Sequence, residues 1–407
     1  MDLVRLNMSH ASHAEARKVI QWVNKLNENA ESPISILVDT QGPEIRTGEL
    51  KNPIDLKTGQ IISLTVRDAD LVETQSILVN YEEIIDVVQV GALITLDNGL
   101  LNFEVLSKDG SRLVCRVLDG GTLGTRKHVN LPGVRVNLPA ITEKDRRDIN
   151  FALEHSVDYI ALSFVREADD ILELRRILGA KGKATKIIAK IEDQSGVENI
   201  HSIVEVADGV MVARGYLGIE TNIADLPNIQ RRIVHASAIG GKRSIVATHL
   251  LESMIEHPIP TLAEVSDVAN AVLDGADCVM LSGETANGKF PRGAVEIMAR
   301  TCMQAEHLQS EMDPTGYESI FALMKDAKYG LAKMSHVESA ASSAVKTATD
   351  IAAKAIIVLS ETGETARYVA KFHPHCPIMA VMAEGTTLND SADIVATLMD
   401  RLPAHVD

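Results

Sequence analysis

The stretch from 186 to 220 carries a lysine, a carboxylate and a glycine-flanked turn at spacings that suit phosphate chemistry. Lys190 and Glu192 lie in the apolar run KIIAKIE, and a strand would place both on one face because alternate residues share a face. A second apolar run, GVMVARG, leads through Arg214 and Gly215 into the turn. A lysine, a carboxylate and free backbone N–H groups together suit a metal-bound phosphate or carboxylate. An ordinary strand pair with surface charges is the alternative.

Apolar runs alternate with helix-like segments at intervals of roughly 25 to 35 residues, the usual length of a βα unit. Active sites of (β/α)₈ barrels lie at the carboxyl ends of the strands, and here a polar residue ends nearly every run. We therefore expect an α/β fold, a TIM barrel whose first strand would precede Met1. The seven expected strands are LVRLN (3–7), ISILVDT (34–40), YIALSF (159–164), KIIAKIE (186–192), GVMVARG (209–215), SIVATHL (244–250) and DCVMLSG (277–283).

Two further units are expected from changes in pattern. Short alternating runs separated by turns such as DNG and KDG predict a β-rich insertion over 49–137. An alanine-rich helix, a strand, a helix and a second strand predict a small α/β domain over 311–407, ending in a helix. The barrel would then be discontinuous, over 1–48 and 138–310.

Composition limits the classes of partner. The formal net charge is −16, which argues against nucleic acid or an anionic membrane. The four cysteines have no CxxC spacing, so we interpret them as reduced structural thiols. No long apolar span and no signal-peptide pattern is present, and a cytoplasmic protein is expected.

Ten segments, in order along the chain, resemble the pyruvate kinase family: RLNMSH, DTQGPEIRTG, LDNGL, RKHVNLPG, LPAITEKD, IIAKIED, VARGYLG, ATHLLESMI, AEVSDVANAVLDGAD and LSGET. The resemblance implies a barrel with an inserted lid and a C-terminal α/β domain. It also implies phosphoryl transfer from phosphoenolpyruvate to ADP with Mg²⁺ and K⁺, in a glycolytic homo-oligomer, a tetramer by analogy.

The resemblance also implies roles for individual residues. Glu192 would bind Mg²⁺, Tyr216 occupies the second Mg²⁺ ligand position, and the K⁺ ligands would be Asn7, Ser9, Asp39 and Thr40. The catalytic groups would be Lys190, Arg46, Thr248 and Ser282. Substrate would contact Arg5, Arg214, Gly215 and Thr248, and nucleotide would contact Lys127, Arg46 and Asn7.

Several of these positions have structural alternatives. Asn7 and Ser9 could cap the following helix, and Asp39 with Thr40 could form an Asx-type turn. Thr248 and Ser282 could be ordinary hydroxyl groups at strand ends.

Tyr216 is the main departure from the family, which has Asp at this position. A phenol, with a pKa of about 10, is protonated at neutral pH and is a poor Mg²⁺ ligand. Leu262 also replaces a family arginine that lies near a subunit interface. The leading hypothesis is a pyruvate kinase, with activity reduced by Tyr216. The alternatives are an impaired or fragmentary paralogue that acts by binding only, and a metal-dependent lyase on a related barrel, against which the inserted lid argues.

Overall fold

The computed structural model describes residues 1–50, 52–66, 76–97, 99–110, 112–134, 136–312 and 334–382. The chain divides into two compact units, Met1–Cys302 and Met303–Asp407.

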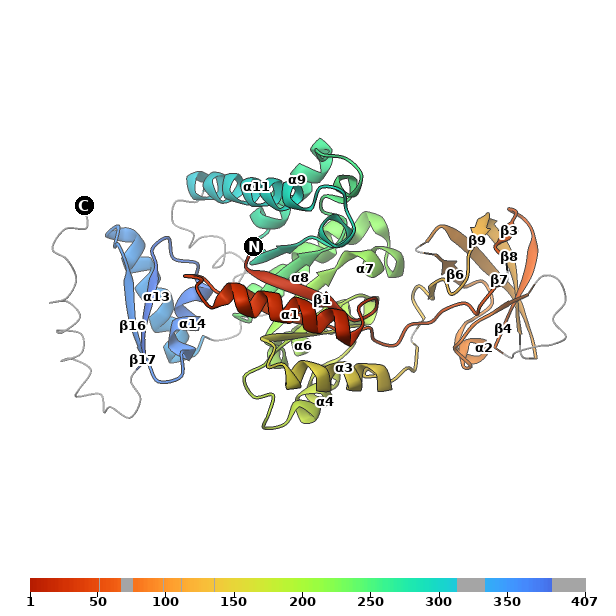
Figure 1. The fold of residues 1–407 in the computed structure, drawn as a ribbon, viewed down its shortest axis with the longest axis horizontal. Helices are drawn as coiled ribbons and strands as arrows, with labels where there is room; N and C mark the ends of the chain where they lie inside the picture. The colour runs from red at the N-terminus through yellow and green to blue at the C-terminus, as the bar shows by residue number, and fades with distance from the viewer. Residues whose placement is uncertain are drawn as a thin grey trace. The chain divides into compact units, whose positions relative to one another are not determined.

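A seven-stranded parallel sheet forms the centre of the first unit (Figure 1). Its order, β1-β2-β11-β12-β13-β14-β15, follows the chain, as expected of consecutive βα units. All seven strands predicted from the sequence are present in this curled, TIM-type sheet. They are β1 (Leu3–Asn7), β2 (Ser35–Asp39), β11 (Tyr159–Leu162), β12 (Lys186–Ile191), β13 (Gly209–Ala213), β14 (Arg243–Ala247) and β15 (Cys278–Met280).

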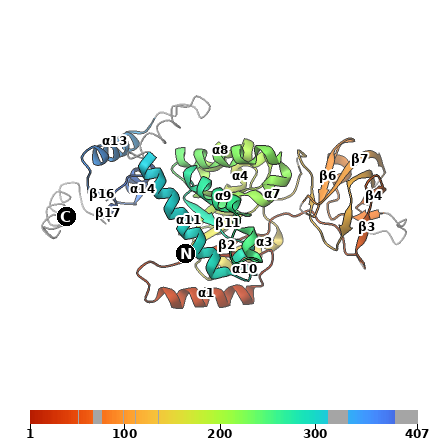
Figure 2. The ribbon, with the colours of Figure 1, turned by 90° about the horizontal axis from the view of Figure 1, so that it is seen from above.

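Helices cover the outer face of this sheet (Figure 2). Several begin at capping boxes, among them α1 at Ser12, α3 at Thr142 and α9 at Thr261. The helical elements are α1 (His13–Asn27), α3 (Glu143–Glu154), α4 (Ala168–Leu178), α5 (Gln194–Glu198), α6 (Ile200–Val206), α7 (Arg214–Glu220), η1 (Ile223–Asp225), α8 (Leu226–Ile239), η2 (Glu252–Ile255), α9 (Leu262–Leu273), α10 (Gly283–Ala286) and α11 (Pro291–Met312).

The inner face of the sheet holds a small apolar cluster that includes Leu37, Ala161, Ile188 and Met211. Side chains alternate between the two faces of a strand, so residues two and four positions further on point to the same side. This alternation places Asp39, Ser163, Lys190 and Glu192 beside one another, just beyond the apolar cluster. The strand ends therefore form a polar site above an apolar floor.

A second sheet, with its own apolar core, forms between β2 and β11 in the sequence. Its order is β10-β6-β7-β8-β4-β5, and most neighbouring strands are antiparallel, but β4 and β5 pair in parallel. The elements of this region are β3 (Ile54–Leu56), β4 (Ile61–Thr65), β5 (Ser76–Leu78), α2 (Ile84–Val87), β6 (Leu93–Leu96), β7 (Leu101–Asp109), β8 (Arg112–Asp119), β9 (Gly121–Leu123) and β10 (Val129–Asn130).

The second unit contains the expected helix–strand–helix–strand sequence: α13 (His336–Asp350), β16 (Ile356–Ser360), α14 (Glu364–Lys371) and β17 (Ile378–Met382). The two strands are parallel, and Val345, Val358, Val369 and Phe372 form the core of this unit. The helix predicted at the end of the chain lies outside the described residues. In the described parts of the chain, no helix is long and apolar enough to cross a membrane.

Candidate active site

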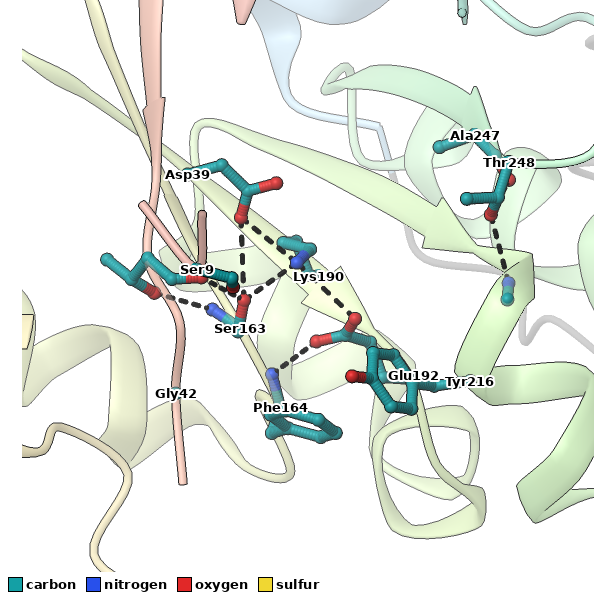
Figure 3. Close-up of polar contacts among 12 residues, drawn as sticks. Ser9, Asp39, Gly42, Ser163, Phe164, Lys190, Glu192, Tyr216, Ala247 and Thr248 are labelled. Atoms are coloured by element: carbon teal, nitrogen blue, oxygen red, sulfur yellow. Dashed lines mark hydrogen bonds and ion pairs between the residues drawn. The ribbon is translucent and has the colours of Figure 1, made fainter. Parts of the chain in front are cut away.

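Lys190 lies at the centre of a buried polar cluster at the carboxyl ends of β2, β11 and β12 (Figure 3). Its Nζ is 3.0 Å from Asp39 Oδ1 and 3.3 Å from Glu192 Oε1, and it donates to Ser163 Oγ at 2.7 Å. Lys190 is only 7% exposed and Glu192 only 1%. The surface-pair alternative is therefore wrong, because these charges are buried and compensate one another.

The charges in this cluster support one another electrostatically. Burial alone would raise the pKa of Asp39, but Lys190 and Arg5 outweigh it and hold this pKa below its ordinary value. Burial alone would lower the pKa of Lys190, but Asp39 and Glu192 raise it above its ordinary value. Burial raises the pKa of Glu192, and Lys190 opposes that shift. The ammonium group of Lys190 therefore remains charged.

Asp39 is shared between two cations from neighbouring strands. Arg5 Nε donates to Asp39 Oδ2 at 2.6 Å, while Lys190 contacts the other carboxylate oxygen. The hydroxyl of Thr40 accepts a hydrogen bond from the backbone N–H of Ser163 at 3.1 Å. These contacts join separate strands, so the Asx-turn alternative is wrong for this pair.

Asn7 and Ser9 form a local turn beyond β1. The backbone N–H of Ser9 donates to Asn7 Oδ1 at 3.1 Å. The N-cap of α1 is Ser12, whose hydroxyl accepts from the backbone N–H of Glu15. The helix-capping alternative for Asn7 and Ser9 is therefore wrong.

The turn expected after β13 is instead the first turn of helix α7, which begins at Arg214. The backbone N–H of Gly215 is not free, because it donates to Thr248 Oγ1 at 2.9 Å. Thr248 has a φ of 70°, in the left-handed region that costs energy for a threonine. The prediction of a turn with a free N–H group at Gly215 is therefore wrong: α7 and the loop after β14 are joined by this hydrogen bond.

Arg214 holds the strained loop in place. Its guanidinium donates to the carbonyl of Thr248 at 2.6 Å and to that of His249 at 3.2 Å. The same group pairs with Asp267 at 2.8 Å, and Arg214 is 8% exposed. Its donors are thus directed at the protein's own backbone and at α9.

Tyr216 joins a second polar cluster. Its hydroxyl lies 3.2 Å from Glu44 Oε1 and 3.1 Å from His128 Nε2. Arg46 completes the cluster, because its Nε donates to Glu44 Oε2 at 2.9 Å and its NH2 lies 2.6 Å from His128 Nε2. Burial, reinforced by Glu44, raises the pKa of Tyr216 further above its ordinary value, so this phenol stays protonated. Burial lowers the pKa of His128 and keeps it mostly neutral at pH 7.

Two predicted residues remain, Lys127 and Ser282. Lys127 Nζ donates to Asp97 Oδ1 at 2.9 Å, within the β-rich region. The hydroxyl oxygen of Ser282 is buried and has no hydrogen-bond partner among the described residues. An unpaired buried hydroxyl is costly and is consistent with a group reserved for a ligand.

Comparison with known proteins shows the family to which the chain belongs. Residues 1–295 match the family profile described as "Pyruvate kinase, barrel domain", and residues 338–398 match "Pyruvate kinase, alpha/beta domain". A pyruvate kinase from Dictyostelium discoideum is 46% identical over 395 residues, covering 95% of this chain and 76% of the relative.

The chain belongs to the pyruvate kinase family.

Two further relatives agree. A pyruvate kinase from Clostridium perfringens is 41% identical over 94% of this chain and 79% of its own length. A crystal structure of a pyruvate kinase from Cryptosporidium parvum superimposes with a TM-score of 0.87 at 41% identity, covering 94% of this chain and 78% of that one. The predicted family and fold class are therefore confirmed.

Sequence reasoning gave no role to two residues that organise this pyruvate kinase site. Glu284 is completely buried and accepts hydrogen bonds from the backbone N–H groups of Leu251 and Ser282. It thereby ties the loop after β14 to the end of β15. His128, next to Lys127 in the RKHVNLPG segment, belongs to the Tyr216 cluster. Only the three-dimensional structure reveals the partners of these two residues.

Proposed function

We propose that this chain transfers the phosphoryl group of phosphoenolpyruvate to ADP, giving pyruvate and ATP. The observation that carries the proposal is the buried lysine between two carboxylates, at the strand ends of a chain of this family. Phosphoryl transfer depends on positioning and charge neutralisation more than on covalent chemistry by the protein. A pre-charged, buried Lys190 meets that requirement. No observation favours the binding-only or the lyase alternative.

The residues around Lys190 fit the two cations that the family implies, Mg²⁺ and K⁺, to different degrees. Mg²⁺ needs one or two carboxylates and takes further oxygens from substrate and water, so Glu192 supplies the minimum. Tyr216 adds only a neutral phenol, already bonded to Glu44. Mg²⁺, when bound, would neutralise charge on the phosphoryl oxygens. K⁺ would take oxygens from Asn7, Ser9, Asp39 and Thr40, of which Asp39 is held in its anionic form.

The cationic side chains would bind the anionic ends of the substrates. Lys190 would lie beside the phosphoryl group in transfer, and Arg5 and Arg46 would contact phosphate oxygens. These arginines are already oriented by Asp39 and Glu44. Arginine suits fixed phosphate contacts, whereas lysine is a compact point charge that can follow a moving group.

The loop after β14 would bind the carboxylate of phosphoenolpyruvate. Thr248 and the backbone near Gly215 would form this carboxylate site. Ser282 and Thr248 would also line the route of the enol proton. We assign Arg214 to positioning, because its guanidinium holds the Thr248 and His249 carbonyls. This refines the substrate contact expected from the sequence.

The domain roles and the assembly follow the family. The 49–137 insertion would act as a lid that excludes water, and Lys127 would bring a charge to the nucleotide phosphates. The barrel would comprise 1–48 and 138–310, with an α/β domain over 311–407. A cytoplasmic homotetramer is proposed, with Leu262, 87% exposed at the start of α9, near a subunit interface.

Pyruvate formation from phosphoenolpyruvate and ADP, with saturating MgCl₂ and KCl, tests the assignment. We expect Lys190→Met to lower kcat at least about a hundredfold, as loss of a preorganised charge does. Lys186→Met is the matched control, because Lys186 begins the same strand but is exposed. Full activity in a folded Lys190→Met variant, or none in the folded wild type, would contradict the proposal.

A further inference from the structure

Two linkers join the parallel sheet to the β-rich region, and a buried carboxylate of the barrel contacts the first of them. This outgoing linker, residues 40–48, follows β2. Asp145, in the first turn of α3, is completely buried. Its Oδ1 accepts hydrogen bonds from the backbone N–H groups of Gln41 and Gly42 at 3.1 and 3.0 Å. The proposed function gives this carboxylate no role.

The same carboxylate holds the end of the return linker, residues 136–142, which leads into α3. Asp145 Oδ2 accepts hydrogen bonds from the backbone N–H of Thr142 at 2.9 Å and from its hydroxyl at 2.6 Å. Four donors thus compensate this carboxylate, as a buried anion requires. Asp145 therefore fixes both the start of the outgoing linker and the end of the return linker.

The outgoing linker also packs closely against the end of β11. Gly42 has a φ of 73°, in the left-handed region that favours glycine. A Cβ atom at this position would lie 2.8 Å from the ring of Phe164 and 2.9 Å from Ser163 Cβ, which is closer than a side chain tolerates. The linker is therefore held by close packing on Phe164 as well as by the hydrogen bonds to Asp145.

Arg166 and Tyr81 hold the return linker. The guanidinium of Arg166 donates to the carbonyls of Val136 and Leu138 at 2.6 and 2.5 Å. The hydroxyl of Tyr81, in the β-rich region, accepts a hydrogen bond from the backbone N–H of Asn137 at 3.1 Å. Both linkers are thus fixed by side chains to which the proposed function gives no role.

A short series of hydrogen bonds leads from the outgoing linker to Arg46. Gln41 Nε2 donates to Glu44 Oε2 at 2.8 Å, and Arg46 Nε donates to the same oxygen at 2.9 Å. The side chain of Glu44 is only 5% exposed, so it is closely surrounded. A shift of the Gln41 backbone away from Asp145 would therefore move Glu44 and turn the guanidinium of Arg46.

We propose that Asp145 is a positioning residue for ADP: it sets the outgoing linker and thereby the guanidinium of Arg46. This role rests on the proposed function, in which Arg46 contacts phosphate and the 49–137 insertion covers the nucleotide. Asp145 acts through the linker and touches neither substrate, because it is completely buried. The carboxylate of phosphoenolpyruvate is assigned to the loop after β14, so a displaced linker affects ADP more than phosphoenolpyruvate.

Steady-state kinetics of Asp145→Asn in the full chain test this role. One amide oxygen cannot accept from all four donors, so the KM for ADP should rise at least about tenfold, because small displacements of a positioned group are costly. The KM for phosphoenolpyruvate should change less than about threefold, since its proposed contacts lie elsewhere. An equal rise in both KM values, or no rise for ADP, would overturn the proposal.

Asp148→Asn is the matched control, because Asp148 lies further along α3 and is also buried, at 3% exposed. Its carboxylate bonds to Lys144 and to His13, both at 2.7 Å, so its loss weakens the same helix without releasing either linker. Neither KM should change more than about threefold. A rise in the KM for ADP as large as in Asp145→Asn would show a general loss of stability and contradict the positioning role.

Gln41→Leu tests the path from the linker to Arg46 and leaves α3 intact. Leucine fills a similar space at this half-buried position but cannot donate to Glu44. The KM for ADP should rise at least about threefold, as expected for loss of a hydrogen bond to a charged group. An unchanged KM for ADP would contradict the path through Glu44.

Hydrogen exchange of residues 40–46, followed by mass spectrometry, needs no turnover and separates this role from the proposed function. The backbone N–H groups of Gln41 and Gly42 should exchange at least about fivefold faster in Asp145→Asn than in wild type, but not in Asp148→Asn. Unchanged exchange in Asp145→Asn would overturn the proposal even in an active enzyme. Faster exchange in a protein that forms no pyruvate would support the linker contact and contradict only the proposed function.

Discussion

The hydroxyl of Tyr216 lies 3.2 Å from Glu44 Oε1, so a neutral phenol is hydrogen-bonded to an acidic side chain. The contact is possible only because the phenol keeps its proton, and burial raises its pKa to favour that form. An aspartate at this position would instead repel Glu44 unless a cation lay between them. The tyrosine thus stabilises the polar cluster through a neutral hydrogen bond, and under the proposed function it would supply no anionic ligand to Mg²⁺.

Asp39 should be essential to the fold as well as to the site. Asp39→Asn removes the carboxylate shared by Arg5 and Lys190 and leaves buried positive charge uncompensated. Breaking a buried ion pair in this way costs about 3 to 5 kcal/mol, so the free energy of unfolding should fall by that order. Urea unfolding followed by circular dichroism measures this loss in the free energy of unfolding.

The control for Asp39 is Asp109→Asn, which breaks the exposed pair with Arg112. Exposed pairs contribute about 0 to 1 kcal/mol. Equal losses in the two variants would show that the buried cluster contributes nothing particular to stability.

Glu220 should make stability depend on pH. Burial raises its pKa to about 7 in the folded state, against an ordinary value of 4.5. Between these values the folded chain holds a proton that the unfolded chain has lost, so the contribution to stability falls as pH rises from about 4.5 to 7. The full change is at most about 3 kcal/mol, from 1.36 kcal/mol per pKa unit.

Glu220→Gln should remove this dependence. The free energy of unfolding of the variant, relative to wild type, should rise between pH 5 and pH 8. Glu198→Gln, at an exposed position of α5, serves as the control. If the free energies of unfolding of wild type and variant differed by the same amount at every pH, a raised pKa at Glu220 would be ruled out.

Arg214→Lys should impair turnover through the loop after β14. Lysine cannot reproduce the two-sided contact with the Thr248 carbonyl and Asp267, so the left-handed backbone at Thr248 loses its support. We expect kcat/KM for phosphoenolpyruvate to fall at least about tenfold, because small displacements of a positioned group are costly.

The comparison variant is Arg243→Lys, whose pair with Asp277 lies at the opposite, amino-terminal end of β14. It should leave kcat/KM unchanged. Equal activity in Arg214→Lys and wild type would remove Arg214 from the positioning role.

The strands and their polar ends were predictable because both signals are local. Apolar runs mark the strands, and alternation places Lys190 and Glu192 on one face, as the structure confirms. The helical start at Arg214 was not predicted, because the glycines of RGYLG are typical of a turn and a contact with Thr248 decides otherwise. The Tyr216 cluster joins side chains from three distant segments, at 44–46, 128 and 216. No local sequence pattern predicts contacts between segments so far apart in the chain.

The most direct test of the account is the Mg²⁺ dependence of pyruvate formation in wild type, Tyr216→Asp and Tyr216→Phe. We predict that folded wild-type protein forms pyruvate, and that Tyr216→Asp lowers the Mg²⁺ concentration for half-maximal rate by about tenfold or more, since a charged ligand interaction is gained. Tyr216→Phe should give no such gain. The same Mg²⁺ requirement in wild type and Tyr216→Asp, or no pyruvate from the folded wild type, would contradict the account.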